Sequence, residues 1–451
     1  MTSQLSQLVS LISNATKSVE DAFAKTAKPD VPSLDDTTPH PLDDQVSSTE
    51  MREAIQTIEG ACAQLCALVA HPNRAMLNRV FNMFEPACIR AVINFNIADH
   101  LLDKPEGVHM TELGKLSGVE PRKLGRIMRL LASNHCFREV NPNVFANNRL
   151  SMMLLSTNGA SAFSDLITDE TNKAAAMLTE NLKDPDWGHS YSPTHTPFNS
   201  WSKYPGTIFS WYQGPGTDIG AAKGIRFGKG MKGWGDFLET SAVVNVFPWS
   251  DLRDGAIVCD MGGGIGVVSM QLVDAYPNLH IVLQDVPAQI EVAKNEVWPK
   301  FCPMAIGEGR VEFKTMDFFA ELPVKGCDVY FVKNILHDWP DKECKMILRN
   351  LVNAMSANSR LLINDYIIQH VNRDSNTPES VSDLKLAPEP LLPNYGAGGM
   401  TQYNMDLAVM CLFNSQERTL EHFIEMCQEV GLKFVRVWDA GETSVIEFCL
   451  E

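Results

Sequence analysis

A glycine-rich segment, Gly262 to Gly266, follows a short apolar run in the second half of this 451-residue chain. Glycine tolerates the backbone conformations of a tight turn and lets a ligand lie against the main chain, here before the helix that residues 267–275 predict. Asp285 ends the next apolar run, nineteen residues after the last of these glycines. A carboxylate at that position can accept hydrogen bonds from ribose hydroxyls. The pattern therefore predicts a site for a ligand that contains a nucleoside.

The order of the glycines distinguishes between two such ligands. Gly262, Gly264 and Gly266 alternate with other residues, whereas a dinucleotide-binding turn has the order G-x-G-x-x-G. Asp260 stands just before the turn, where a carboxylate would repel a pyrophosphate but attract the ammonium of an amino acid. The combination resembles the first motif of Rossmann-like methyltransferases, which bind S-adenosylmethionine, and it disfavours NAD. A glycine-rich turn that binds no ligand is the other alternative.

A second acidic position follows the third predicted strand of this region, in the order Met316, Asp317, Phe318. The carboxylate can accept from an exocyclic amine, and the thioether and the ring beside it suit the faces of an adenine. The alternative is an ordinary acidic residue at a strand end, with two core residues as neighbours.

His337 follows a fourth predicted strand at its carboxyl end, where ligands bind in parallel α/β sheets. With Lys333, Asp338 and Trp339 it closely resembles the LHDW segment of the plant caffeic-acid-type and fungal O-methyltransferases. The resemblance covers roughly residues 75–451. It implies S-adenosyl-L-methionine as cofactor, S-adenosyl-L-homocysteine as product, a small aromatic acceptor and a homodimer formed through the N-terminal domain.

The same resemblance assigns roles to individual residues. It places the general base on His337 and the two acids that flank the imidazole on Asp365 and Glu417. The family often has Glu at the first of these acids, so Asp365 is a shorter version. Together with the residues considered above, the predicted cofactor contacts are Asp260, Gly262, Gly264, Asp285, Met316, Asp317, Phe318 and Lys333.

A base is required because methyl transfer from a sulfonium is an in-line displacement that needs a nucleophilic oxygen. A phenol has a pKa near 10 and a free imidazole near 6.5, so complete proton transfer before attack would cost about 5 kcal/mol. Flanking carboxylates stabilise the imidazolium and narrow that gap. Because a carboxylic-acid acceptor would need no base, a histidine with two acids favours a hydroxyl acceptor.

Candidates for the substrate side come from two segments. An aromatic-rich stretch, 198–234, is either core packing or, by its position in the family, a set of substrate-lining helices. Residues 371–399, rich in Pro and Gly, are either a surface loop or a lid. The predicted substrate contacts are Trp211, Met231, Asp338, Met410, Phe413 and Asn414.

Short β-rich apolar runs alternate with helical periodicity after residue 240, which predicts a doubly wound α/β domain. The resemblance implies a Rossmann-like methyltransferase sheet, mostly parallel with an antiparallel last strand. The predicted strands are 256–259, 280–284, 311–315, 329–332, 361–363, 433–437 and 444–449.

The N-terminal part is predicted to be all-helical with a winged helix, from helices at 87–102, 111–117 and 120–134 and a β-ribbon at 136–146. A winged helix invites a DNA-binding interpretation, but residues 51–150 have twelve Lys and Arg against nine Asp and Glu, a net charge of only +3. A dimerisation module is favoured. The predicted divisions are 1–50 (helix and flexible linker), 51–160 (winged-helix dimerisation domain), 161–240 (helical connector) and 241–451 (catalytic domain).

Composition excludes several classes of function. A net charge of −17 disfavours nucleic acid as the main partner. No apolar run is long enough for a membrane span, and the first residues lack the pattern of a signal peptide. The eleven Cys are scattered without CxxC pairs, which predicts reduced thiols and a cytoplasmic protein. No metal site is predicted, because no histidines or carboxylates have ligand spacing.

These patterns together predict an S-adenosylmethionine-dependent O-methyltransferase that acts on a phenolic hydroxyl of a secondary metabolite. One alternative keeps the fold and the cofactor but catalyses a dehydration or a pericyclic ring closure, as some fungal relatives do. The other is a DNA-binding regulator.

Overall fold

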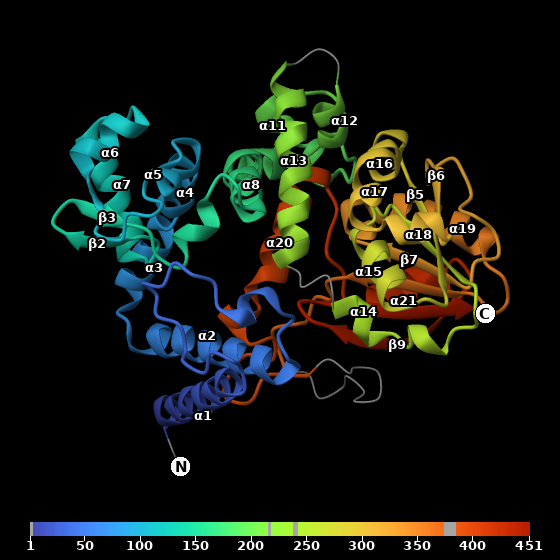
Figure 1. Ribbon diagram of the computed structural model, residues 1–451, viewed down its shortest axis with the longest axis horizontal. Coiled ribbons are helices and arrows are strands. Elements are labelled where there is room, and N and C mark those ends of the chain that lie inside the picture. Colours follow the sequence, from blue (N-terminus) through green and yellow to red (C-terminus); the bar gives the residue numbers. More distant parts are fainter. Residues whose placement is uncertain (1–2, 215–217, 238–241, 374–384) are drawn as a thin grey trace. The chain divides into compact units, whose positions relative to one another are not determined.

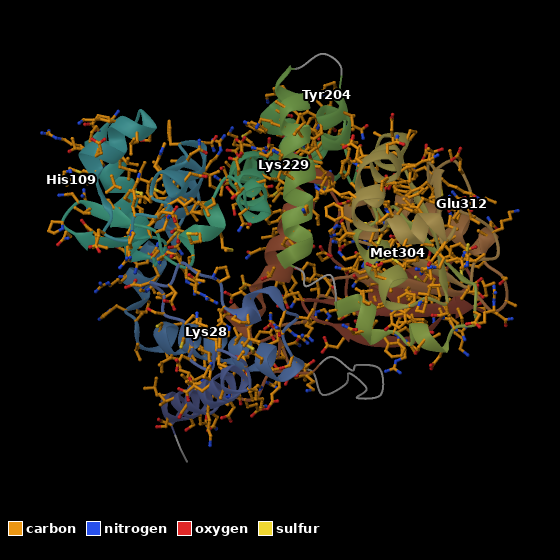
Figure 2. All side chains as sticks on the ribbon, viewed as in Figure 1. Lys28, His109, Tyr204, Lys229, Met304 and Glu312 are labelled. Carbon is orange, nitrogen blue, oxygen red and sulfur yellow. The ribbon has the colours of Figure 1, made fainter. Side chains whose placement is uncertain are left out.

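The computed structural model describes residues 3–214, 218–237, 242–373 and 385–451 (Figure 1). The chain divides into two compact units. The N-terminal unit comprises Met1–Gly188 and Thr196–Leu238, and the C-terminal unit comprises His189–His195 and Glu239–Glu451. Figure 2 shows the side chains on the same ribbon, with Lys28 and His109 labelled in the N-terminal unit and Met304 in the C-terminal unit.

A seven-stranded sheet forms the centre of the C-terminal unit, in the order β6-β5-β4-β7-β8-β10-β9. The first five strands in this order pair in parallel, and β10 is antiparallel to both of its neighbours. This confirms the predicted doubly wound, mostly parallel sheet with an antiparallel last strand. The strands are β4 (Ala256–Met261), β5 (Leu279–Asp285), β6 (Val311–Thr315), β7 (Val329–Lys333), β8 (Arg360–Asp365), β9 (Leu432–Ala440) and β10 (Thr443–Leu450).

Strand residues alternate between two hydrophobic cores, which is why the sheet is covered on both faces. Cys259 and Met261 pack with α19 and α21, whereas Ala256 and Val258 pack with α14, α15 and α17. The helix α19 connects β7 to β8, and its apolar residues Cys344, Ile347, Leu348 and Leu351 are buried at helical spacing. The helices of this unit are α14 (Val243–Val246), α15 (Val267–Ala275), α16 (Pro287–Val292), α17 (Trp298–Phe301), α18 (Pro303–Gly307), α19 (Asp341–Ala354), α20 (Met400–Phe413) and α21 (Leu420–Gln428), with the shorter helices η6 (Trp249–Asp251), η7 (Ala293–Val297), η8 (Leu336–Asp338) and η9 (Gly396–Gly399).

The parallel register brings four strand ends to one edge of the sheet. Met261 pairs with Gln284, so β4 and β5 end side by side, and Lys333 pairs with Asn364 at the ends of β7 and β8. Side chains at or just after these ends are therefore held near one another by backbone hydrogen bonds. This edge carries most of the residues that the sequence predicted as a site.

The N-terminal unit begins with two long helices and continues into the predicted winged helix. A three-stranded sheet in the order β1-β3-β2 forms the wing beside α6 and α7. The elements are α1 (Gln4–Ala24), η1 (Pro41–Asp44), α2 (Thr49–Val69), α3 (Pro72–Phe81), α4 (Phe84–Asn94), α5 (Ile97–His100), β1 (Val108–His109), α6 (Met110–Ser117), α7 (Pro121–Ser133), β2 (Arg138–Asn141), β3 (Val144–Ala146) and η2 (Ser151–Leu154).

One helix prediction in this unit was wrong. The helix predicted at 87–102 is divided into α4 and α5, because Asn96 has a positive φ of 50° that ends the helical path. The helix α3 was not among the helices predicted by their bounds. Its residues Leu77, Val80 and Phe81 repeat at helical spacing, but none of the residues described in α3 is buried, so this apolar face does not pack on a core.

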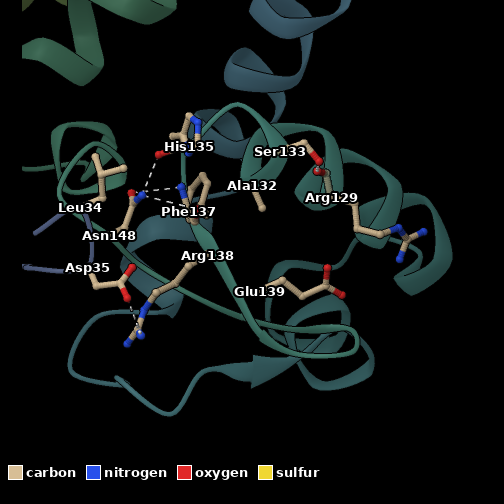
Figure 3. Close-up of a pocket in the computed structure, with 10 residues that line it drawn as sticks. All are labelled: Leu34, Asp35, Arg129, Ala132, Ser133, His135, Phe137, Arg138, Glu139 and Asn148. Atoms are coloured by element: carbon tan, nitrogen blue, oxygen red, sulfur yellow. Dashed lines mark hydrogen bonds and ion pairs between the residues drawn. The ribbon is translucent and has the colours of Figure 1, made fainter.

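The segment between α1 and α2, predicted as a flexible linker, makes specific contacts. His40 is buried, its Nε2 lies 2.8 Å from the carbonyl oxygen of Lys28, and its ring meets that of Phe23. Further along, Asp35 lies 3.6 Å from Arg138 of the wing. A pocket of about 360 Å³ is lined there by Leu34, Asp35, Arg129, Ala132, Ser133, His135, Phe137, Arg138, Glu139 and Asn148 (Figure 3).

A buried ionic cluster fixes the long helix α13 within the N-terminal unit. Asp169 lies in the π-helical segment η3, and its carboxylate is 2.9 Å from Arg90 of α4 and 3.3 Å from Arg226 of α13. Close packing of α13 on α8 adds to this, since a Cβ on Gly233 would come within 2.3 Å of the backbone of Gly159. The elements are α8 (Gly159–Leu166), η3 (Ile167–Thr171), α9 (Asn172–Ala175), α10 (Leu178–Lys183), η4 (Trp187–His189), α11 (Pro197–Ser202), α12 (Ile208–Gln213) and α13 (Asp218–Phe237).

None of the helices in the described ranges combines the length and the hydropathy that a bilayer-spanning helix needs. The predicted loop or lid at 371–399 is described only in part, because residues 374–384 lie outside the described residues. In its described part, Arg373 donates to the carbonyl oxygen of Leu391 (3.1 Å), and Leu391, Asn394 and Tyr395 are buried.

Candidate active site

The turn between β4 and α15 requires glycine for two separate reasons. Gly262, Gly264 and Gly266 have φ values of 73°, 59° and 84°, a backbone region that other residues adopt at a cost. A Cβ on Gly262 would also come within 2.4 Å of Ile335, and one on Gly266 within 2.8 Å of Trp298. A Cβ on Gly264 would meet no atom within 4 Å. The middle of the turn therefore borders open space, as a backbone cradle for a ligand must.

Asp260 lies beneath this turn. Its side chain is 3% exposed and accepts a hydrogen bond from Ser269 Oγ of α15 at 2.6 Å. Burial raises the pKa of Asp260 to about 6, and the bond from Ser269 opposes part of that rise. The carboxyl group thus joins the end of β4 to the first turns of α15, a structural role that the sequence did not predict.

Asp285 faces the turn from the end of β5. Its Oδ2 accepts from the backbone N–H of Gly264 at 2.8 Å, and its Oδ1 accepts from that of Val286 at 2.7 Å. Each carboxylate oxygen has a further lone pair, so both can still accept from ligand hydroxyls. Asp285 therefore fixes the shape of the glycine turn and keeps capacity to bind a ribose.

The residues after β6 are only partly buried. Met316 is buried and its sulfur accepts from Gln284 Nε2 at 3.5 Å, whereas Asp317 is exposed and its Oδ1 accepts from the N–H of Phe319. The ring of Phe318 lies at an edge-on angle to Trp339, with 6.2 Å between centroids. An exposed carboxylate beside an aromatic pair at this sheet edge has the composition of an adenine site.

Lys333 ends β7 and interacts by charge with two carboxyl groups. Burial lowers the pKa of Lys333 to about 8, and the charges of Asp365 and Asp260 oppose that decrease. The lysine therefore connects electrostatically the glycine turn, where Asp260 lies, to the region of β8, where Asp365 lies. A partly charged amine at this position can bind a ligand carboxylate.

His337 lies in η8 just after β7, in a buried position. Its Nδ1 is 2.8 Å from Oε1 of Glu417, and because an ionised carboxylate only accepts, Nδ1 is the donor. The other ring nitrogen, Nε2, is 3.5 Å from Oδ1 of Asp338. Burial would lower the pKa of His337, but the charges of Glu417 and Asp338 outweigh it and raise that pKa to about 10.

The second predicted flanking acid is placed differently from the first. Asp365 is fully buried at the end of β8, and its Oδ1 accepts from the backbone N–H of Asn334 at 3.0 Å rather than from the imidazole. Two carboxylate oxygens, Oδ2 of Asp365 and Oε2 of Glu417, are buried without a hydrogen-bond partner among the described residues. Burial raises the pKa of Asp365 to about 7. The nearer neighbour of the ring is Asp338, whose pKa burial raises to about 6.

The predicted substrate contacts fall into two groups. Trp211 and Met231 belong to the N-terminal unit, where Trp211 packs against Phe198. Met410, Phe413 and Asn414, with Asp338, belong to the C-terminal unit. Asn414 has a φ of 56°, and its amide donates to the carbonyl oxygens of Ser190 (3.1 Å) and Ser192 (2.8 Å).

Two residues that contact the segments of Glu417 and His337 were missed by sequence reasoning. Asp406 of α20 accepts from the backbone N–H of Glu417 at 2.8 Å. Arg418 is 1% exposed and donates to the carbonyl oxygen of Leu336, next to His337. The one signal in the sequence was that Arg418 is adjacent to a predicted catalytic acid. Among the described residues, no group of three or more His, Cys, Asp or Glu could hold a metal ion.

Comparisons with known proteins agree along the chain. Residues 225–433 match the O-methyltransferase domain family, and residues 78–157 match the O-methyltransferase dimerisation domain family. A protein of Phanerochaete chrysosporium named 3-O-methyltransferase 2 is 40% identical over 445 residues, which cover 98% of this chain and 97% of the relative. The match to the dimerisation domain family, residues 78–157, includes the winged helix.

Solved structures share the fold. The structure of OxaC in complex with SAH and oxaline has a TM-score of 0.71, with 19% identity, and covers 99% of both chains. A structure described as a pericyclic reaction enzyme has a TM-score of 0.69, with 18% identity, and covers 97% of this chain and 99% of its own. At these identities the likeness concerns the fold alone.

A doubly wound sheet whose ligand-binding edge carries a glycine turn and a buried histidine–carboxylate pair defines an α/β enzyme that acts beside a nucleoside-containing ligand. Given the identity along nearly the whole chain and the order of the two matched domains, this chain belongs to the S-adenosylmethionine-dependent O-methyltransferases that carry a dimerisation domain, a family that includes fungal enzymes of secondary metabolism. The predicted family, fold class and enzyme class are confirmed.

Gly264→Ala tests whether the open side of the turn binds the cofactor. We expect the protein to fold, at a cost of about 1–2 kcal/mol for the positive φ, and the Kd for S-adenosylhomocysteine to rise about tenfold, because a methyl group would occupy the space beside Asp285. The matched control is Gly309→Ala, which also has a positive φ (68°) and no atom within 4 Å of its Cβ, but lies before the start of β6. Calorimetry should separate the two variants, and equal affinities would contradict the assignment.

Proposed function

We propose that the chain transfers a methyl group from S-adenosylmethionine to a phenolic hydroxyl of a small aromatic metabolite, with His337 as the general base. The observation that supports the base is the 2.8 Å contact between His337 Nδ1 and Glu417. With the Nδ1 proton directed to a carboxylate, the neutral ring has its lone pair on Nε2. That nitrogen is then available to accept a proton from a substrate hydroxyl.

The raised pKa of His337 is close to the pKa of the phenolic hydroxyl whose proton has to be transferred. A phenol with a pKa near 10 is about 3.5 units above a free imidazole, whereas His337 has its pKa raised to about 10. Transfer of the phenol proton to the neutral ring would therefore be nearly balanced, but a ring with this pKa is cationic at neutral pH, so part of the cost of about 5 kcal/mol moves to the prior loss of its own proton. Phenol with neutral imidazole and phenolate with imidazolium differ only in the position of one proton, so both can lead to the reactive oxygen.

The other acidic groups near the ring would support this cycle. Asp338 lies next to Nε2, and its charge adds to that of Glu417 in stabilising the imidazolium. Asp365 acts at longer range, through its charge, since its hydrogen bond goes to Asn334. Because Asp338 and Asp365 each interact by charge with His337, their titrations are coupled to that of the ring.

S-adenosylmethionine would supply an electrophilic methyl group on its sulfonium. The residues present fit such a ligand, since Gly264 borders open space, Asp285 can accept from ribose hydroxyls and Lys333 can bind a carboxylate. Asp317 and Phe318 are proposed for the adenine. Gly262 would shape the turn, and Met316 would pack behind the adenine ring. Asp260 would add negative charge near the amino-acid end of the ligand.

On the substrate side we propose apolar contacts with few polar groups. In the C-terminal unit these are Met410 and Phe413 of α20, and in the N-terminal unit they are Trp211 and Met231. Asn414 is proposed to act indirectly, because its amide already binds the carbonyl oxygens of Ser190 and Ser192. Flat aromatic acceptors pack well on such side chains.

We also propose a homodimer formed through the N-terminal unit. The match to a dimerisation domain suggests a dimer, and the helix α3 supplies a suitable exposed surface. Met76, Val80 and Phe81 are 61%, 60% and 54% exposed, and Met83 beyond the helix is 65% exposed. A cluster of large apolar side chains in water is typical of a protein–protein interface.

His337→Ala should lower kcat by about 10²- to 10⁴-fold, the usual contribution of a general base, without loss of cofactor binding. The assay follows transfer of labelled methyl to a panel of phenols, and calorimetry measures S-adenosylhomocysteine binding. His280→Ala, an exposed histidine at the start of β5, is the control. Full activity of the His337 variant would exclude it as the base, and product formed without S-adenosylhomocysteine would indicate a dehydration or a pericyclic reaction instead.

Glu417→Gln should shift the pH dependence to lower values. Because His337 is cationic below its raised pKa, kcat/KM of the unmodified chain should rise with pH about tenfold per unit below that pKa. Without the Glu417 charge the pKa should fall by about 1–3 units, so the rising limb moves to lower pH and the plateau falls, since the base is weaker. The control is Glu421→Gln, an exposed acid on α21. A rising limb that stays in place would contradict the proposed role of Glu417.

Met76→Glu combined with Val80→Glu should dissociate the proposed dimer, because two charges would be buried in the interface. Sedimentation velocity should show a shift from dimer to monomer, while circular dichroism stays unchanged. Leu182→Glu, at another exposed apolar position of the same unit (57% exposed), is the control. A dimer that survives the double substitution would exclude α3 from the interface.

A further inference from the structure

Arg418 connects the two chain segments that carry the proposed base and its acid. It follows Glu417 directly, and its side chain is fully buried. One of its terminal nitrogens donates to the carbonyl oxygen of Leu336 at 2.8 Å, and the other donates to that of Trp339 at 2.8 Å. These two residues flank His337 and Asp338, so the guanidinium binds both ends of the turn that holds the imidazole.

The positive charge of Arg418 is paired with the carboxylate of Asp341 and not with Glu417. Asp341 Oδ1 accepts from Nε at 3.0 Å and from a terminal nitrogen at 2.9 Å, and Asp341 Oδ2 lies 2.9 Å from Nε2 of His422. Burial would raise the pKa of Asp341, but the bonds and charges of Arg418 and His422 keep it low. A paired, planar guanidinium with several fixed acceptors is rigid, so it can act as a positioning element.

Both connected segments have little regular secondary structure: His337 lies in the three-residue helix η8, and Arg418 forms an isolated bridge with Ile367. The turn around His337 follows Asn334, which has a φ of 52°, and the loop before Glu417 follows Asn414, which has a φ of 56°. The hydrogen bond between His337 and Glu417 spans 80 residues of sequence and depends on the relative position of these two segments. Ser415 adds one more link, donating to the carbonyl oxygen of Trp339 at 2.7 Å.

We infer that Arg418 is a positioning residue, which holds the Glu417 carboxylate against the imidazole of His337 and so sets the basicity of that ring without contact to substrate or cofactor. The inference rests on the proposed role of His337 as base. The groups that face the imidazole are Glu417, Asp338 and Asp365, and the charged group bonded to Arg418 is Asp341.

The sign of one measurement separates positioning from a simple charge effect. Removing a nearby cation by itself raises the pKa of a histidine, because the imidazolium is repelled less. Loss of a correctly placed Glu417 carboxylate lowers it. Arg418→Met should therefore lower the pKa of His337 if Arg418 acts through Glu417, and raise it or leave it unchanged if it does not.

The pKa of His337 can be measured in the chain without cofactor, by NMR titration of ¹³C-labelled imidazoles with His337→Asn for assignment. We expect Arg418→Met to lower that pKa by about 1–3 units and to lower kcat about 100-fold, the effect of a displaced catalytic group. The Kd for S-adenosylhomocysteine should change less than about twofold. Arg418→Lys, which keeps the charge but not the forked geometry, should give an intermediate loss.

Arg310→Lys is the matched control. Its guanidinium also donates to a backbone carbonyl, that of Val273, and pairs with an acid, Glu308, but it lies just before β6. Its substitution should leave the pKa of His337 unchanged. If Arg418→Met does not fold, Arg418→Lys carries the same test, because it keeps the charge but cannot bond both carbonyl oxygens with a forked group.

A double substitution distinguishes failure of this inference from failure of the proposed function. If Arg418 acts through Glu417, Arg418→Lys should add little to the loss in Glu417→Gln, whereas independent roles give additive losses. Additive losses, or a His337 pKa that rises or stays in place, would overturn the positioning role. A Glu417→Gln variant with unchanged activity would instead overturn the proposed function.

Discussion

The buried contact between His337 and Glu417 is the interaction on which the candidate site depends. Water screens charges poorly at such a depth, so a carboxylate 2.8 Å away changes the proton affinity of the ring far more than it would at the surface. Asp338 and Asp365 add to the same field, and burial raises their own pKa values in return. The titrations of His337, Asp338 and Asp365 are therefore coupled. The raised pKa of His337, on which its proposed role as a base depends, follows from the surroundings of the histidine more than from the histidine itself.

The parallel sheet explains why this set lies near the strand ends that carry the proposed cofactor site. Strands that run in one direction end at one edge, and the register aligns the end of β4 with that of β5 and the end of β7 with that of β8. The glycine turn, Asp285 and the turn of His337 all follow such ends. Lys333 interacts by charge with both Asp260 and Asp365 and so connects the two regions. Backbone hydrogen bonds therefore determine the distances that side-chain chemistry needs.

Much of the fold could be predicted from the sequence, because periodicity reflects burial. The strand at 311–315 and the helix at 267–275 have the predicted bounds. The errors have physical causes as well. The break at Asn96 is a single left-handed residue within an apolar run, which periodicity does not reveal. The apolar residues of α3 are exposed rather than buried among the described residues, so this helix contributes no core.

The sequence by itself determined the glycine turn, the acidic residues at strand ends and the histidine after a buried strand, because each of these depends on residue type and on a local spacing of strand and helix. The tertiary structure alone decided which acid contacts the imidazole, that Asp365 binds Asn334, and that Arg418 joins two turns. These contacts connect segments separated by about 30 to 80 residues in the chain. A hydrogen bond depends on distances of a few tenths of an ångström, and no local pattern of residues specifies a distance between segments so far apart.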